Sequence, residues 1–469
     1  MGTISSAFNL ISGALNADQS ALSIVANNVA NANTTGYSRE VPNWQENTPV
    51  QINGVSYGTG VTQTGPTSVR DRVLEQRLAQ QQQLASASGS RLTALNTLQS
   101  LFTPNSGSST STAGDIGSDI TSFFNSFSSL EANPTSNALR QQVLSSGTAL
   151  AGDVSNAAAS LNAQQTALDQ EAAGLTSQVN SLTSAIAQLN QQIQSLPSSG
   201  SGALEDQRQQ DIAQLSQLIG INQVTTENSG LSITTTSGQL LVSQAASFQL
   251  TSGPAGGLTH FFLGGNDVTS SLTTGGGQLG GLLTARDIDI PNALAGLDQL
   301  AYAISSAVNA QNNAGADLAG DTSNAGDIFL QPTAVTGSAA SMRVVMTDPG
   351  HIAAASASAG AGDNSNALIM ANLSNQAIIN GQTPSNYYSQ FVSLLGSTVS
   401  EVQTENTAQS ASVTQLQTQI SALSGVNLSD EAAAMQQFER SYQAASQVFA
   451  ILNTVIASAL NLGVQTAVS

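Results

Sequence analysis

The stretch LNAQQTALDQEAAGLTSQVNSLTSAIAQLNQQIQSL, residues 161–196, carries the strongest secondary-structure signal in the chain. Leucine recurs at every seventh position, and the position four residues after each leucine is apolar except for Gln165. Spacing of this kind marks the two core positions of a coiled-coil helix. The two sets are Leu161, Leu168, Leu175, Leu182, Leu189 and Leu196, and Ala172, Val179, Ile186 and Ile193.

This helix is followed by a turn and a second helix. Pro197 cannot continue a helix, and residues 198–202 are serine and glycine. Helical spacing resumes at Leu204 and continues to Ile219. The pattern therefore predicts an antiparallel helical hairpin.

Further helices are expected at 69–102, at 290–312 and over 391–423, where apolar residues again recur at helical spacing. The middle differs, because residues 222–280 alternate with period two around a Ser-Gly turn, which indicates a β-hairpin over 231–242. Shorter strands are expected near 247–251, 259–263 and 342–346. The predicted fold class is mainly α, with long terminal helices pairing as a coiled coil and a helical-rod middle that carries a small β-rich insertion.

Each end of the chain carries one narrow apolar stripe at helical spacing, interrupted in the first case by Asp18. Asn427 or Ser429 is expected to cap the last helix, and Gly463 fits its C-terminal stop. The stripes either pair within one monomer or also contact neighbouring subunits, and sequence alone does not choose between these. The predicted subunit-assembly face comprises Ile4, Phe8, Ile11, Leu15, Leu22, Val25, Val29, Met435, Phe438, Tyr442, Phe449, Leu452 and Ile456.

Composition excludes several classes of function. The 469 residues include 29 acidic and 10 basic side chains, all of the latter arginine, which gives a net charge of −19. This balance argues against nucleic acid as a partner, because phosphate binding depends on clustered Lys and Arg. Without cysteine there is no disulfide, Cys-based zinc site or thiol nucleophile. No basic residue precedes Arg39 and no long apolar run occurs, so we expect neither a cleaved secretory signal nor a membrane span.

Motifs for cofactor or metal chemistry are weak, and we predict no enzyme activity, no cofactor and no metal. Gly275, Gly277 and Gly280 spell a dinucleotide-like pattern, but the required preceding strand is lacking. His260 and His351 have no third ligand at metal spacing, and the aspartates between 317 and 327 do not match a calcium loop.

The segment Leu22-Ser23-Ile24-Val25-Ala26-Asn27-Asn28-Val29-Ala30-Asn31-Ala32-Asn33-Thr34-Thr35-Gly36-Tyr37-Ser38-Arg39 resembles the N-terminal signature of bacterial flagellar rod, hook and hook-associated proteins. Residues 424–432 and 438–463 resemble the matching C-terminal signature, and residues 277–287 and 307–320 are similar to the interior of the hook-filament junction family, the FlgK type. Asparagine side chains suit a loop where a helix frays, and Gly36 suits a left-handed turn. The signature loop comprises Asn27, Asn28, Asn31, Asn33, Gly36, Tyr37 and Arg39.

The resemblance implies a secreted structural subunit of the extracellular flagellum, located at the hook-filament junction. It further implies export through the flagellar type III apparatus and assembly through the terminal helices. The implied partners are identical subunits, the hook protein, a second junction protein on the filament side, and a cytosolic export chaperone that binds the C-terminal region. The alternative function is an exported coiled-coil adhesin or host-interaction protein with a β-rich binding head.

The predicted domain organisation divides the chain into four parts. Residues 1–35 with 425–469 form a terminal coiled-coil domain, and 36–221 with 281–424 form a helical rod domain. Residues 222–280 form the β-rich insertion. Residues 328–366 form a second small insertion of strand or loop.

Overall fold

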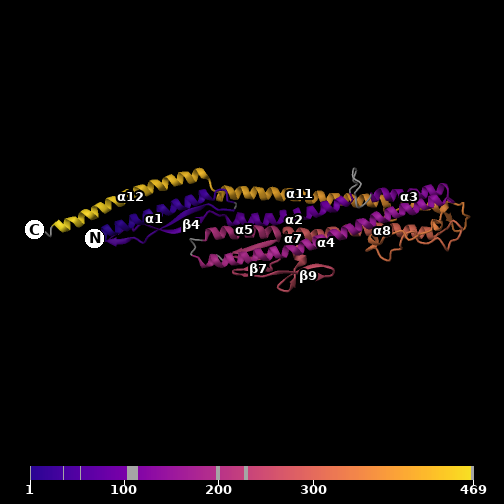
Figure 1. Cartoon of the computed structure of the whole chain (residues 1–469), viewed down its shortest axis with the longest axis horizontal. Helices are drawn as coiled ribbons and strands as arrows, with labels where there is room; N and C mark the ends of the chain where they lie inside the picture. The colour runs from indigo at the N-terminus through magenta and orange to yellow at the C-terminus, as the bar shows by residue number, and fades with distance from the viewer. Residues whose placement is uncertain are drawn as a thin grey trace. The chain divides into compact units, whose positions relative to one another are not determined.

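The computed structural model describes residues 2–34, 36–52, 54–102, 115–196, 201–225 and 231–465. The fold is mainly α with a small β content, as predicted (Figure 1). The chain folds into two compact units. Unit 1 comprises Met1–Gln83, Ser177–Leu250 and Ser410–Ser469, and unit 2 comprises Leu84–Thr176 and Thr251–Gln409. Three helices and one strand run through both: α2 (Arg72–Phe102), α4 (Asn137–Ser195), α11 (Pro384–Ser424) and β9 (Leu250–Ala255).

Unit 1 contains both terminal helices, a β-hairpin region and an antiparallel sheet. The helices are α1 (Gly2–Ala30), α5 (Gly202–Leu218) and α12 (Leu428–Gln465). The strands after α1 are β1 (Glu40–Glu46), β2 (Val50–Ile52), β3 (Val55–Tyr57) and β4 (Val61–Ser68), with β1 paired to β4 and β2 to β3. The sheet has the order β5 (Ile221–Thr225), β6 (Leu231–Thr235), β7 (Leu240–Ser243) and β8 (Ala246–Ser247).

Asparagines of α4 hold the strands of unit 1 through their backbone groups. Asn180 donates to the carbonyl of Leu250 at 2.8 Å and accepts from its amide at 2.8 Å. Asn190 donates to the carbonyls of Leu231 and Gln244 and accepts from Arg208 of α5 at 2.9 Å. The last bond joins the two arms of the predicted helical hairpin, whose connecting residues 197–200 lie outside the described residues.

Unit 2 is built on α3 (Ile116–Ala132) and α8 (Ile290–Asn313), with short elements between 258 and 375. These are β10 (Leu258–Leu263), β11 (Asn266–Asp267), α6 (Thr269–Thr273), α7 (Gly277–Thr284), the π-helical turn η1 (Ala285–Asp289), β12 (Gly315–Ala316), α9 (Ser338–Ser341), η2 (Pro349–His351), β13 (Ala355–Ser356), α10 (Ser365–Asn372) and η3 (Leu373–Asn375). Phe123, Phe124 and Phe127 of α3 are buried, and the ring of Phe123 lies 5.3 Å from that of Phe329.

Arg286 connects several elements of unit 2 through hydrogen bonds. Its guanidinium donates to Asp169 of α4 at 2.6 Å and to the carbonyl of Thr259 in β10 at 2.8 Å, and it is 1% exposed. Gln165, the polar residue in the leucine repeat, donates to the carbonyl of Arg286 at 2.9 Å. The one polar residue in the leucine repeat, Gln165, therefore has a hydrogen-bond partner, and this bond holds the π-helical turn η1 that precedes α8.

The hairpin over 231–242 and the strand near 259–263 are confirmed as β6–β7 and β10. The range 247–251 is divided between the end of β8 and the start of β9, and residues 248–249 belong to neither strand. The prediction of a strand at 342–346 is wrong, because Val344 is the one residue of this range that forms a β-bridge, to Phe329. Gly463 does not end the last helix, which continues to Gln465. Strands β1–β4 were not predicted, because their residues are mostly polar and Pro42 is paired with Pro66.

Candidate assembly site at the paired termini

The two terminal helices pack together in antiparallel orientation within unit 1. The ring of Phe8 lies 4.8 Å from that of Phe449, whereas near the other end of α1 Asn28 contacts Glu431 of α12. Figure 1 shows α1, in indigo, beside α12, in yellow. The terminal helices thus pair as predicted, while the coiled-coil geometry of this pairing stays a prediction.

Most residues of the two apolar stripes are buried or half-buried. In α1, Ile11 and Val25 are buried and Phe8, Leu15 and Leu22 are half-buried. Two positions of the predicted face are more than a third exposed, Val29 at 40% and Tyr442 at 39%. The side chain of Ile4 lies outside the described residues. The half-buried positions of α12 are Met435, Phe438, Phe449, Leu452 and Ile456.

The hairpin β1–β4 covers a second side of this pair. Trp44 of β1 packs edge-on against Phe438, with ring centroids 5.9 Å apart. The backbone of α1 approaches the hairpin closely, since a Cβ on Gly13 would lie 3.3 Å from the carbonyl oxygen of Val61. The terminal helices and this hairpin therefore pack against one another within unit 1.

Asn28 is the centre of a polar cluster at the end of α1. Its side chain is 1% exposed and has four hydrogen bonds. The amide nitrogen donates to the carbonyl of Glu40 at 2.8 Å and to Glu431 at 3.0 Å. The amide oxygen accepts from the Tyr37 hydroxyl at 2.8 Å and from the Glu40 amide at 2.9 Å. One asparagine thereby joins α1, the signature loop, β1 and α12.

Glu431 is the acidic partner that connects the two ends of the chain. It is 1% exposed and accepts from the Arg39 guanidinium at 2.6 Å as well as from Asn28. The backbone amide of Arg39 donates to the carbonyl of Ser424 at 2.9 Å, which fixes the link before α12. Two hydrogen-bonded partners satisfy this buried carboxylate, as burial of a charge requires.

The cluster is also anchored to α5 through Asp206. The amide of Ser38 donates to Asp206 at 3.1 Å, and Arg70 lies 3.3 Å from the same carboxylate. Burial raises the pKa of Asp206, whereas these two partners lower it. Burial likewise raises the pKa of Tyr37, and the negative charges of Glu40, Asp206 and Glu431 act in the same direction. The Tyr37 hydroxyl therefore keeps its proton and acts as a donor to Asn28.

The remaining signature residues shape the loop itself. Asn31 donates to the Asn27 carbonyl and side-chain oxygens at 3.0 and 2.9 Å, which closes the frayed end of α1. Gly36 has φ +79°, and a Cβ there would lie 2.5 Å from Gln210. Asn33 is exposed, and its side chain makes no hydrogen bond to any residue that the structure describes.

Sequence reasoning identified the loop but missed its acidic partners. By sequence, Glu431 is only an acidic residue in the first turn of α12, and Asp206 has no evident role. No local sequence pattern marks these contacts, because the contacting residues are far apart in the chain. Asn28 and Glu431, for example, are separated by 403 positions. Of the two candidate caps for α12, Asn427 is the one used, and its side chain accepts from the amide of Ser429 at 3.0 Å.

Nothing in the described part of the chain forms a metal site of three or more His, Cys, Asp or Glu side chains. His260 instead contacts Asp267 at 2.6 Å. Gly277 begins α7 after a short helix rather than after a strand, so the glycine pattern lacks the setting of a dinucleotide site. Within the described ranges, no helix combines the length and hydropathy that a membrane crossing requires.

Comparisons with known proteins match both the ends and the interior. A family model described as the flagellar hook-associated protein FlgK helical domain matches residues 105–329, and the flagella basal body rod protein model matches residues 8–37. Flagellar hook-associated protein 1 of Escherichia coli K12 is 26% identical, with 98% of this chain and 100% of that protein covered. The corresponding protein of Bacillus subtilis is 27% identical, with 96% of each covered.

The structure of the flagellar hook junction protein FlgK from Burkholderia pseudomallei has the same fold, with a TM-score of 0.63 at 19% identity over 73% of this chain and 99% of that chain. These matches are to structural axial proteins of the bacterial flagellum, not to enzymes. Among such proteins, the chain is similar to the FlgK family of flagellar hook-associated proteins, through its residues 105–329 and through relatives that match nearly its full length.

Proposed function

We propose that this chain joins the hook to the filament at the distal end of the flagellar hook, and that it assembles there through its terminal helices. Its neighbours in this proposal are identical subunits, the hook protein on one side and a second junction protein on the other. The relatives' names support the hook association. The predicted division into terminal, rod and inserted domains remains part of the same proposal.

One observation carries the proposal of assembly through the termini. Besides the stripe that faces α1, α12 has a second apolar stripe, defined here as the outer stripe: Val448, Ile451 and Val455. These side chains are 47%, 62% and 48% exposed. They recur at steps of three and four residues and so lie along one line of the helix. A helix with two apolar flanks, of which one is covered within the monomer, is typical of a subunit that packs against neighbours.

The outer stripe also supports binding by an export chaperone before assembly. An exposed apolar line on a C-terminal helix is prone to association with other chains unless another protein covers it. We propose that a cytosolic chaperone covers this region until the chain passes unfolded through the flagellar type III apparatus. The absence of cysteine is compatible with that route, since no disulfide has to be reduced.

The experiment replaces one residue of the outer stripe and a matched neighbour. We expect Ile451→Asp to abolish filament attachment in a strain that lacks its own copy, because a charge in a subunit contact is costly. The free chain should stay folded, because Ile451 is 62% exposed in the monomer. Asn453→Asp adds the same charge at an exposed position two residues further on, and should leave attachment unchanged.

The readouts are filament counts by electron microscopy, secretion of the variant into the medium, and circular dichroism of the purified chain. Normal filaments on cells with Ile451→Asp would contradict the placement of the subunit contact. Absence of the labelled wild-type chain from purified flagella would contradict the proposed function as a whole.

A further inference from the structure

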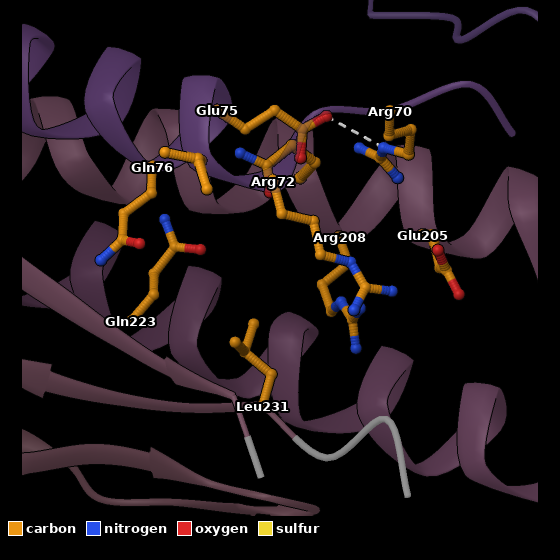
Figure 2. A pocket seen from close by; sticks show the side chains of 10 residues that line it. Arg70, Arg72, Glu75, Gln76, Glu205, Arg208, Gln223 and Leu231 are labelled. Carbon is orange, nitrogen blue, oxygen red and sulfur yellow. Dashed lines mark hydrogen bonds and ion pairs between the residues drawn. The ribbon is translucent and has the colours of Figure 1, made fainter. Parts of the chain in front are cut away.

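A cavity of about 270 Å³ in unit 1 is lined by three of the ten arginines of the chain. It lies between the start of α2 and one side of α5, next to the ends of β5 and β6. Arg70 and Arg72 approach from the α2 side and Arg208 comes from α5, as Figure 2 shows. At about 30 Å³ per water, the cavity has room for roughly nine water molecules or a few side-chain groups.

Most carboxylates near the cavity already have partners of their own. Glu75 accepts from Arg70 at 2.9 Å, and Glu205 accepts from the Ser201 hydroxyl at 2.9 Å. Asp206 accepts from the Ser38 amide and lies 3.3 Å from Arg70. Arg70 is therefore the one arginine of the three that has carboxylate partners in the described residues.

Arg72 and Arg208 lack such a partner. Arg208 donates to the neutral side-chain oxygen of Asn190 at 2.9 Å, and the exposed side chain of Arg72 makes no hydrogen bond or ion pair with any residue in the described ranges. Burial lowers the pKa of Arg208; Glu205 opposes this, while the charges of Arg70 and Arg72 add to it. Glu75 and Glu205 line the same cavity and offset part of the repulsion between Arg72 and Arg208, and a further carboxylate placed between the two guanidinium groups would relieve the rest.

We propose that this cavity, defined here as the arginine pocket, binds carboxylates of an acidic segment from a second copy of the chain. Guanidinium groups bind carboxylates in pairs of parallel hydrogen bonds, and the amides of Gln76 and Gln223 at the wall offer further donors. The occupant follows from charge complementarity, because each copy carries 29 acidic residues and a net charge of −19. The inference rests on the proposed function, in which identical subunits are neighbours.

The absence of lysine allows a direct chemical test. Arg72→Lys would create the single side-chain amine of the protein, since no lysine occurs in the sequence. A carbodiimide activates a carboxylate in contact with that amine. The amine then displaces the activating group as a urea, and an amide bond forms. The probe is a water-soluble carbodiimide applied to purified hooks with attached filaments, from cells in which the variant is the only copy of the chain.

We expect a cross-linked product of twice the 47.6 kDa chain mass, in which position 72 is joined to an Asp or Glu of another copy. The matched control is Arg77→Lys, an exposed position five residues further along α2 that does not line the pocket. A cross-link from position 72 to Glu75 or Glu205 of the same chain alone would overturn the proposal. So would a cross-link to a different flagellar protein, or an equal yield of dimer from the control.

Charge reversal gives a second, functional measurement. We expect Arg72→Glu to weaken the subunit contact roughly tenfold, as for loss of about 1.4 kcal/mol, and to lower filament retention under shear. Retention equal to that of Arg77→Glu would overturn the pocket as a subunit contact. If instead the wild-type chain itself fails to restore filaments in the deletion strain, the proposed function has failed and not the pocket alone.

Discussion

Substitution of Asn28 tests whether the polar cluster holds the two ends of the chain together. Asn28→Ala removes all four hydrogen bonds of the side chain and leaves the Tyr37 hydroxyl, the Glu40 amide and the Glu431 carboxylate with fewer partners. Because Asn28 is 1% exposed, water does not reach these groups without movement of the loop or of α12. The cost is therefore that of leaving buried groups unpaired.

The size of the effect follows from the bond types. Three neutral bonds at about 1 kcal/mol each and one bond to a charged carboxylate at about 2 kcal/mol give a sum of about 5 kcal/mol. Relaxation of the loop recovers part of this, so we expect a loss of about 3 kcal/mol in the free energy of unfolding of unit 1. With a urea slope of about 3 kcal/mol per M, the unfolding midpoint should fall by about 1 M.

Trp44 provides the assay, because it is the single Trp in the sequence and packs against Phe438 of α12. Its fluorescence during urea unfolding reports the separation of β1 from α12 in unit 1. Asn33→Ala, in the same loop but exposed, is the matched control and should shift the midpoint by less than about 0.2 M. A midpoint for Asn28→Ala within the range of this control would refute the reasoning.

Two further predictions concern Gly36 and Asp119. Gly36→Ala should destabilise unit 1 more than Gly54→Ala, by about 1 kcal/mol or more. Both glycines have φ +79°, but of the two only Gly36 has a neighbour, Gln210, that the added Cβ would meet. Equal urea midpoints by Trp44 fluorescence would contradict this. Burial and the neighbouring Asp153 raise the pKa of Asp119 to about 7. Folding therefore favours the protonated form of Asp119. The loss of folding stability caused by burying this carboxyl group is absent below about pH 4 and grows as the pH rises to about 7. Asp119→Asn should stabilise the chain by about 1 kcal/mol at pH 8, after allowance for solvent screening, and by much less at pH 4. Thermal unfolding followed by circular dichroism at both pH values checks this, and an equal gain at both would count against it.

Local sequence patterns determined the helices and the central strands. The leucine repeat over 161–196 specifies a helix because its core positions recur on one face, and in unit 1 Val179 and Ile186 are fully buried. The alternation around Gly238 specifies the β6–β7 hairpin, since residues at period two share one face of a strand. The Asn-rich loop and the left-handed Gly36 were also readable, because each depends on the chemistry of a few adjacent residues.

Only the tertiary structure determined which distant groups meet. Strands β1–β4 form although their local propensity is weak, because α1 packs against their hairpin. Glu431 looked like an ordinary first-turn acidic residue of α12, but packing places it against Asn28 and Arg39, near the other end of the chain. The arginine pocket likewise combines positions 70–76 with 205–223. Such contacts leave no periodic trace in the sequence, because their geometry depends on how whole helices pack and not on the spacing of neighbouring residues.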